Sequence, residues 1–339
     1  MKIELDKKDR RILSELTLNS RVPLNRLARK VQVSREVATY RINRLVKSRI
    51  IKDFYTIISA ETLGFQRYGC FFQFKGVSKP KEEEFIDYLV KHEFVNYLSP
   101  VIGRWNVVFD LHAKNKEHLK EIIYQISEKF GKYLKKYTII GLETELESFP
   151  LKIFGSGKEL DDKNNNKNFK IDETDRKILK IISNNSRAEY KEISEKTEMS
   201  ANAIKYRIKN LENSGIIQGY TLSVDIKELG HEFYNIQVKT GDEKDNKLRN
   251  FFRNNKHVTY FYKYLGNENW DFDIGLNVKS SSELREFILE LREKFGDILE
   301  VKEIYVVVGE RKGNYLPRGI FKTDSQNQQL TLKTKTNNQ

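Results

Sequence analysis

The residues best suited to chemistry lie between positions 34 and 52, where hydrogen-bonding side chains alternate with cations. We predict a helix over SREVATYRINRL (34–45) that buries Ala38, Ile42 and Leu45. Its outward side chains would then be Arg35, Glu36, Thr39, Tyr40 and Asn43. Arginine pairs with guanine, a carboxylate accepts from the amino group of cytosine, and a threonine methyl group contacts thymine. This face therefore predicts contact with base edges in duplex DNA. Ser34 would be the N-cap of this helix and is also a candidate DNA contact.

Cations beside that face are better placed for phosphate groups than for bases. They are Arg41, Arg44, Lys47, Arg49 and Lys52. Neutralising a handful of phosphates would make the affinity for DNA fall by orders of magnitude between low and moderate salt. Replacing Arg41 and Arg44 with alanine is then expected to weaken binding to all sequences. The alternative is a basic helix face that is merely solvated.

A second copy of this helix follows 166 residues later, as SANAIKYRIKNL (200–211). The positions that would cap or pack are kept, whereas most outward positions differ. The candidate DNA contacts in this copy are Ser200, Asn202, Lys205, Tyr206, Arg207 and Lys209. Fewer cations surround this helix and Glu212 enters, so we expect a weaker or divergent contact. The alternative is a helix kept for packing or dimerisation.

The repeat extends over most of the chain. LDKKDRRIL (5–13) returns as IDETDRKIL (171–179), and SEKFG (127–131) returns as REKFG (292–296). Two copies of this length indicate a duplicated protein rather than a solenoid. The Asn/Lys-rich segment between the copies predicts a flexible linker, and the polar C-terminal residues predict a disordered tail.

Each copy is predicted to begin with three short helices, with Asp6 and Asp172 as N-caps of the first. Strands and two longer helices follow in the order βαββαβ, which gives an α+β fold class: two copies of a winged helix-turn-helix followed by a ferredoxin-like domain. The expected boundaries are a helix-turn-helix at 1–62, a βαββαβ domain at 63–154, a linker at 155–169, a second helix-turn-helix at 170–228, a second βαββαβ domain at 229–317 and a tail at 318–339.

Charge is distributed unevenly between the copies. The 339 residues carry 61 Lys+Arg and 48 Asp+Glu, a formal net charge of +13. Residues 1–60 hold 15 cations against 6 acids (net +9), whereas residues 170–229 hold 11 against 10 (net +1). The excess favours an anionic partner at the first copy. No apolar run reaches the roughly 18 residues that cross a bilayer, and no apolar signal segment opens the chain, so we expect a cytoplasmic protein without membrane attachment.

These motifs together resemble the Lrp/AsnC (leucine-responsive/asparagine regulator) family of transcription factors. The resemblance rests on Leu-Asp-x-x-Asp-x-x-Ile-Leu, Asn-Ser-Arg, the Ser-x-x-x-Ala-x-x-Arg-Ile-x-x-Leu helix, Ile-Ile and Leu-Gly, each of which occurs twice with minor changes. It implies a winged helix-turn-helix followed by a βαββαβ effector and oligomerisation domain. Family members usually dimerise through their sheets, so the duplication implies an intramolecular pseudo-dimer, with self-association as a further expectation.

The family also implies a small-molecule effector, usually an amino acid, at a loop that reads Gly-x-aromatic-Asp. The matching residues are Gly103, Trp105 and Asn106 in the first copy, and Gly266, Trp270 and Asp271 in the second. The first copy has an amide in place of the acid, and the second has two inserted residues. Packing and turn formation are the alternative roles of these side chains.

The sequence offers little for catalysis. The five histidines, His92, His112, His118, His231 and His257, lack the spacing of metal ligands, and no nucleophile is followed by a base partner. We therefore expect no metal, no cofactor and no enzymatic activity. The competing hypothesis is a siroheme-decarboxylase-like enzyme, which has a related fold and would need cations and histidines around a tetrapyrrole cavity. A scaffold that does not bind DNA is a third possibility.

Overall fold

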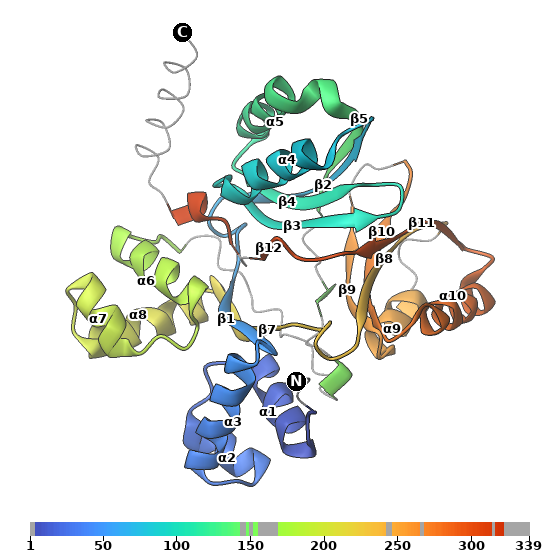
Figure 1. Ribbon diagram of the computed structural model, residues 1–339. Coiled ribbons are helices and arrows are strands. Elements are labelled where there is room, and N and C mark those ends of the chain that lie inside the picture. Colours follow the sequence, from blue (N-terminus) through green and yellow to red (C-terminus); the bar gives the residue numbers. More distant parts are fainter. Residues whose placement is uncertain are drawn as a thin grey trace.

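The computed structural model describes residues 4–142, 147–148, 152–154, 169–241, 246–264, 268–313 and 316–321 (Figure 1). The first copy begins with α1 (Lys7–Leu18), α2 (Leu24–Val31) and α3 (Arg35–Lys47). Asp6 caps α1 in a capping box with Asp9, and Ser34 caps α3, as predicted. The amphipathic spacing of these helices buries one shared core, made mainly of Ile12, Leu13, Leu16, Leu27, Val31, Ile42 and Leu45.

The second copy repeats this unit as α6 (Glu173–Asn184), α7 (Tyr190–Thr197) and α8 (Ala201–Asn213). The predicted capping box of Asp172 with Asp175 is present, and Ser200 caps α8. The turn before the third helix contains a left-handed residue in each copy, Gln32 (φ 57°) and Glu198 (φ 58°). The same sequence frame therefore produces the same turn twice.

A two-stranded antiparallel ribbon joins the two helical units. It pairs β1 (Ile51–Ile58) with β7 (Ile217–Val224), with Phe54 opposite Leu222. Each strand packs on the helices of the other copy: Ile58 belongs to the core of the second unit and Leu222 to that of the first. The ribbon lies between the two units in Figure 1. The two units are thus joined by two paired strands, each of which contributes side chains to the core of the other unit.

Each copy continues with a four-stranded antiparallel sheet. The first holds β2 (Gln66–Phe74), β3 (Val95–Ile102), β4 (Val107–Ala113) and β5 (Leu134–Gly141), in the order β5-β2-β4-β3, with α4 (Lys79–Lys91) and α5 (Lys116–Phe130). The second holds β8 (Glu232–Thr240), β9 (Val258–Lys263), β10 (Phe272–Val278) and β11 (Leu299–Val307), in the order β11-β8-β10-β9, with α9 (Asn246–Asn254) and α10 (Ser281–Phe295).

The two sheets are connected at their edges and packed through one face. Val306 of β11 pairs with Ile102 of β3. The helices cover the outer face of each sheet over an apolar core. Between the inner faces lies a third core, in which Phe71 contacts Trp105 and Trp270 with ring centroids 5.8 and 5.3 Å apart. Alternating side chains on each strand supply both cores.

The end of each copy crosses the other copy before it returns to its own helical unit. In the first copy, β6 (Glu147–Ser148) pairs with β9, and the short helix η2 (Lys152–Phe154) follows. In the second, β12 (Lys312–Gly313) pairs with β3, and η3 (Arg318–Phe321) follows. The expectation of a disordered tail from residue 318 is wrong for residues 318–321, because Ile320 is fully buried in the core of the second helical unit.

Candidate nucleic-acid interface

The outward face of α3 is open to solvent. Tyr40 is 66% exposed, and Arg35, Glu36 and Asn43 are exposed as well. Ala38, Ile42 and Leu45 are buried against α1 and α2. The sequence-predicted division into a packed stripe and an outward face is therefore present. A third helix held by its apolar stripe can present its other face to a DNA groove.

Two of the outward side chains have local partners. The hydroxyl group of Thr39 donates to the carbonyl oxygen of Arg35 at 2.9 Å. Glu36 lies at the N-terminus of α3, where its own backbone N–H and the hydroxyl group of Ser34 lower the pKa of its carboxyl group. Glu36 is thus held as an anion at the helix end, where the dipole favours a negative charge.

Arg41 and Arg44 serve the fold, which changes the role expected for them. Nη1 of Arg41 lies 2.7 Å from a carboxylate oxygen of Asp6 and 2.9 Å from one of Asp9, and Arg44 also pairs with Asp9. Asp9 is completely buried. A buried carboxylate needs paired cations. These two guanidinium groups therefore fasten α3 to the start of α1, a role that the sequence did not predict for them.

The remaining predicted phosphate contacts lie in different places. Lys47 and Arg49 are exposed at the end of α3. Arg49 adopts a left-handed backbone conformation (φ 60°), whereas the equivalent residue in the second copy is Gly215 (φ 77°). A side chain in this region costs about 1–2 kcal/mol relative to glycine. The side chain of Lys52 forms an ion pair within the protein, with its Nζ 2.8 Å from a carboxylate oxygen of Glu310.

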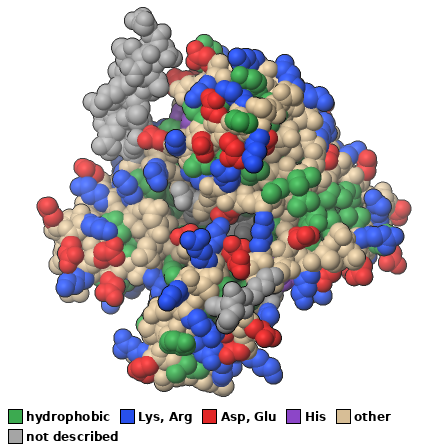
Figure 2. All heavy atoms as spheres, viewed as in Figure 1, with side chains coloured by type: hydrophobic (Ala, Val, Ile, Leu, Met, Phe, Trp, Pro, Cys, Tyr) green, Lys and Arg blue, Asp and Glu red, His purple; other side chains and the backbone are tan. Residues whose placement is uncertain are grey.

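Sequence reasoning missed the cations of α2. Arg26 and Arg29 are exposed on this helix, beside the exposed Lys30. The sequence contained a signal for these exposed cations, because they occupy the polar positions between the apolar residues of the amphipathic helix. Figure 2 shows Lys and Arg side chains gathered over this lower unit, with a few acids among them. The first copy thus presents exposed cations from two helices.

The second copy presents a less basic face. Tyr206 is 68% exposed on α8, and Asn202, Lys205 and Lys209 are exposed too. Arg207 repeats the fastening role of Arg41, with Nη1 2.7 Å from Asp172 and 2.8 Å from Asp175. Asn210 and Gly215 replace Arg44 and Arg49. The packing contacts are therefore shared by the copies, and the cations are not.

The predicted effector residues have internal partners. Asn106 accepts a hydrogen bond from the backbone N–H of Phe74 at 2.8 Å, and Asp271 accepts one from that of Thr240 at the same distance. The amide and the acid thus terminate equivalent strands in the two copies. Trp105 and Trp270 are buried with ring centroids 6.2 Å apart. A Cβ on Gly103 would come within 2.8 Å of Tyr305, and Gly266 lies outside the described residues.

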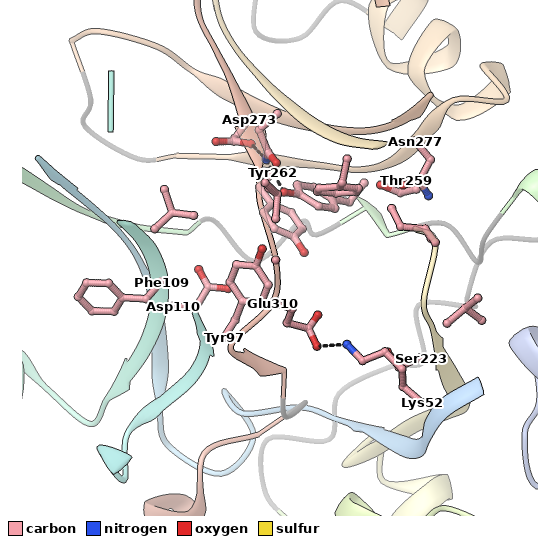
Figure 3. Close-up of a pocket in the computed structure, with 18 of the residues that line it drawn as sticks. Lys52, Tyr97, Phe109, Asp110, Ser223, Thr259, Tyr262, Asp273, Asn277 and Glu310 are labelled. Atoms are coloured by element: carbon pink, nitrogen blue, oxygen red, sulfur yellow. Dashed lines mark hydrogen bonds and ion pairs between the residues drawn. The ribbon is translucent and has the colours of Figure 1, made fainter. Parts of the chain in front are cut away.

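A cavity of about 650 Å³ lies at the centre of the molecule, between the sheets and the β1–β7 ribbon (Figure 3). Residues of both copies line it, and three tyrosines of β9 and its end, Tyr260, Tyr262 and Tyr264, share one wall. Their spacing of two in VTYFYKY places them on one face of a strand, which is the sequence signal that could have found them. None of the five histidines lines this cavity.

The described residues contain no group of three or more His, Cys, Asp or Glu side chains that could hold a metal ion. Within the same ranges, every helix is too short or too polar to pass through a bilayer.

Comparison with known sequences identifies both helical units. Residues 5–46 match the AsnC-type helix-turn-helix domain, and residues 171–218 match the winged helix-turn-helix DNA-binding family. An HTH-type transcriptional regulator of Pyrococcus furiosus is 33% identical over 119 residues, which are 35% of this chain and 79% of that protein. The regulator LrpA of Pyrococcus horikoshii is 43% identical over 75 residues, which are 22% of this chain and 53% of that protein.

Comparison with solved structures finds the arrangement of the whole chain. The siroheme decarboxylase NirDL superposes with a TM-score of 0.63 over 91% of this chain and 93% of that one, at 15% identity. The same enzyme with an iron-uroporphyrin III analogue gives a TM-score of 0.64 over 92% and 94%, at 14% identity. At these identities the likeness concerns the fold alone.

Proposed function

The chain belongs to the Lrp/AsnC family of helix-turn-helix transcriptional regulators, and we propose that this DNA-binding regulator binds specific double-stranded sequences in the cytoplasm chiefly through α3 of its first copy. The proposal rests on one observation: α3 carries two sets of side chains with different roles. One set of side chains fastens the helix through the buried Asp9, and another set, Arg35, Tyr40, Asn43 and Lys47, stays exposed. A rigidly held helix with exposed donors suits contact with base edges.

We further propose that each copy is a winged helix-turn-helix followed by a ferredoxin-like domain, and that the chain is an intramolecular pseudo-dimer. The strand order β5-β2-β4-β3 and its equivalent β11-β8-β10-β9 support the ferredoxin-like assignment. The exchanged strands β1 and β7 support the pseudo-dimer, because they place α3 and α8 in a constant relation. Such a protein would contact two sites at a constant spacing along DNA.

The first copy is assigned the stronger contact because its exposed cations are more numerous. Arg35, Lys47 and Arg49 have no cationic counterpart in the second copy, where Ala201, Asn213 and Gly215 stand. Lys205 and Lys209 are the exposed cations of α8. Each phosphate contact changes the dependence of log K on log salt by about 0.9. The copies should therefore contribute unequally to the salt dependence.

Binding to DNA selected from random duplexes tests the proposal. Fluorescence anisotropy over a range of salt concentrations would compare the wild type with R35A/K47A/R49A and with the matched variant K205A/K209A. We expect the first variant to lose tenfold or more in affinity, with a salt slope shallower by roughly 2 to 3, and the second to lose less. A wild-type chain that binds no duplex in dilute buffer would overturn the proposed function. A larger loss in K205A/K209A would reverse the ranking of the copies.

The central cavity does not favour the tetrapyrrole enzyme. Its lining includes four acids, Asp110, Asp225, Asp273 and Glu310, against three cations, Lys52, Arg67 and Lys227, and two of those cations are already paired with lining acids. A polycarboxylate such as siroheme would need an excess of cations. The lining therefore does not fit a substrate of the siroheme kind.

A further inference from the structure

We propose that the central cavity is a binding site for a small organic cation, an amine or a quaternary ammonium compound, whose charge meets Asp273 and whose body is enclosed by tyrosine rings. The site differs from the effector loop expected from the family, because Trp105, Asn106, Trp270 and Asp271 do not line the cavity. Its volume of about 650 Å³ is that of a small-molecule pocket.

The aromatic wall provides the first argument. The rings of Tyr260 and Tyr262 are stacked with centroids 4.1 Å apart and an interplanar angle of 13°. Tyr97, Tyr264 and Tyr305 also border the cavity. The guanidinium carbon of Arg67 lies 4.9 Å from the centroid of the Tyr262 ring, so this wall already holds one cation. Aromatic faces attract cations most strongly where water is excluded.

The buried charge of Asp273 provides the second argument. This residue is 1% exposed, and its hydrogen-bond donors are neutral: the hydroxyl group of Tyr305 at 2.9 Å, the amide of Gln237 at 3.3 Å and the amide of Asn235. Burial raises the pKa of its carboxyl group to about 6, which leaves it mostly ionised at neutral pH. Within the described ranges Asp273 forms no ion pair. A buried carboxylate without a counter-ion is costly, and a bound cation would remove that cost.

The other charges of the lining have protein partners. The half-buried Asp225 accepts a hydrogen bond from the backbone N–H of Lys227 at 3.0 Å, and Nζ of Lys227 donates to the carbonyl oxygen of Val308. Arg67 pairs with Asp110, and Lys52 pairs with Glu310 at the opposite side of the cavity (Figure 3). Both acids are therefore already neutralised. An anionic ligand would find its cations engaged and would approach the charge of Asp273. A cation is the ligand class that leaves all these pairs intact.

Asn277 supplies a further polar contact for the ligand. It borders the cavity, is 1% exposed, and neither its amide nitrogen nor its amide oxygen has a hydrogen-bond partner among the residues that the structure describes. Buried amide groups are nearly always hydrogen-bonded. Because Asn277 lies four residues along β10 from Asp273, about 13 Å away, a ligand with a donor or an acceptor at the end far from its charge would satisfy this side chain.

Isothermal titration calorimetry of the full-length chain tests the proposal without DNA, so its outcome is independent of the proposed function. The probes are benzylamine and benzyltrimethylammonium, with benzyl alcohol as the uncharged analogue. We expect both cations to bind at least tenfold more tightly than the alcohol. Asp273→Asn should weaken cation binding at least tenfold. The control Glu303→Gln changes an acid of β11 that does not line the cavity, and this variant should bind the cations as the wild type does.

A second variant guards against a folding defect in Asp273→Asn. Ser223→Trp places a large ring on the ribbon side of the cavity and leaves Asp273 unchanged (Figure 3). This variant should bind none of the three probes while its circular dichroism spectrum matches that of the wild type. The proposal fails if Asp273→Asn binds the cations as tightly as the wild type, if the alcohol matches the amines, or if no cation binds at millimolar concentration.

Discussion

The hydroxyl oxygens of Ser20 and Ser186, which occupy equivalent positions in the two copies, lie 2.6 Å apart. Each serine is flanked by an arginine that bonds to the other copy: Arg21 donates to the carbonyl oxygen of Ser186 at 2.5 Å, and Arg187 donates to that of Ser20 at 2.6 Å. A residue that contacts its own equivalent marks a two-fold axis, as in an isologous dimer. The duplicated chain therefore contains, within one molecule, the contact of a symmetric dimer.

The paired copies should stay together after the chain is cut. A protease site inserted between residues 154 and 169, in the predicted linker, would leave the ribbon β1–β7 and the β3–β11 pairing intact. We expect the cut protein to elute from a size-exclusion column at the volume of the uncut protein. Separation into two smaller species at micromolar concentration would show that the joined chain, rather than the interface, holds the copies together.

The ion pair of Arg41 with Asp9, and the equivalent pair of Arg207 with Asp175, should contribute to the stability of the two helical units. Arg41→Ala leaves the buried Asp9 with Arg44 alone, so we expect the free energy of unfolding to fall by roughly 2 kcal/mol, less than the ~3–5 kcal/mol of a buried pair broken outright. Arg207→Ala should lower the stability of the second unit by more, ~3–5 kcal/mol, because Asn210 stands where Arg44 does and Arg207 is the one ion-pair partner of Asp175 among the described residues. Arg35→Ala is the control, because its exposed side chain should change DNA binding and leave the urea midpoint unchanged.

The left-handed backbone conformation of Arg49 should lower the stability of the protein, while its charge should strengthen DNA binding. Arg49→Gly relieves a left-handed backbone conformation, so the free energy of unfolding should rise by about 1 kcal/mol while DNA affinity falls. The reciprocal change, Gly215→Arg, should destabilise the second unit by a similar amount. Thermal denaturation and DNA titration of both variants measure the two effects. If Arg49→Gly is less stable than the wild type, the side chain makes contacts that outweigh the strain.

Acidification should lower stability through two buried histidines. Burial, with nearby Lys312 and Arg67, lowers the pKa of His92 to about 4 and that of His112 to about 3. Between pH 6 and pH 4 the unfolded chain binds protons at both imidazoles and the folded chain does not. The free energy of unfolding therefore decreases as the pH is lowered. Asp273, with its pKa raised to about 6, binds a proton in the folded state and offsets one of them. These three groups together should give a net slope of about 1.4 kcal/mol per pH unit, and the lowered pKa values of His118 and His231 add to it.

Urea titrations at several pH values measure that slope. Asp273→Asn removes the offset, so its stability should fall about twice as steeply in the same range. A wild-type stability that is constant from pH 6 to pH 4 would show that the two histidines are protonated in the folded state. The carboxyl group of Asp6, whose pKa is lowered to about 2, adds to the loss of stability as the pH approaches its unfolded value of 3.8, and continues to do so below this range.

The helical units were the most predictable part of this protein. Capping residues such as Asp6 and Ser34 and the apolar stripe of each helix are local signals, because a helix depends on contacts between neighbours in the chain. The outward residues followed once the buried stripe was assigned. The ion pair of Arg41 was nevertheless not predicted, because its partner Asp9 lies 32 residues away in the sequence and only the packing of α3 on α1 brings them together.

The amino-acid sequence by itself determined the duplication, the two helical units, the order of the elements and the basic excess of the first copy, since each of these is written in local spacing or composition. Tertiary structure alone decided that β1 and β7 exchange between the copies, that Ser20 meets Ser186, and that tyrosines of one sheet enclose a cavity with a buried Asp273. The first two of these contacts join residues more than a hundred positions apart, and strand pairing over such distances depends on how complete surfaces fit.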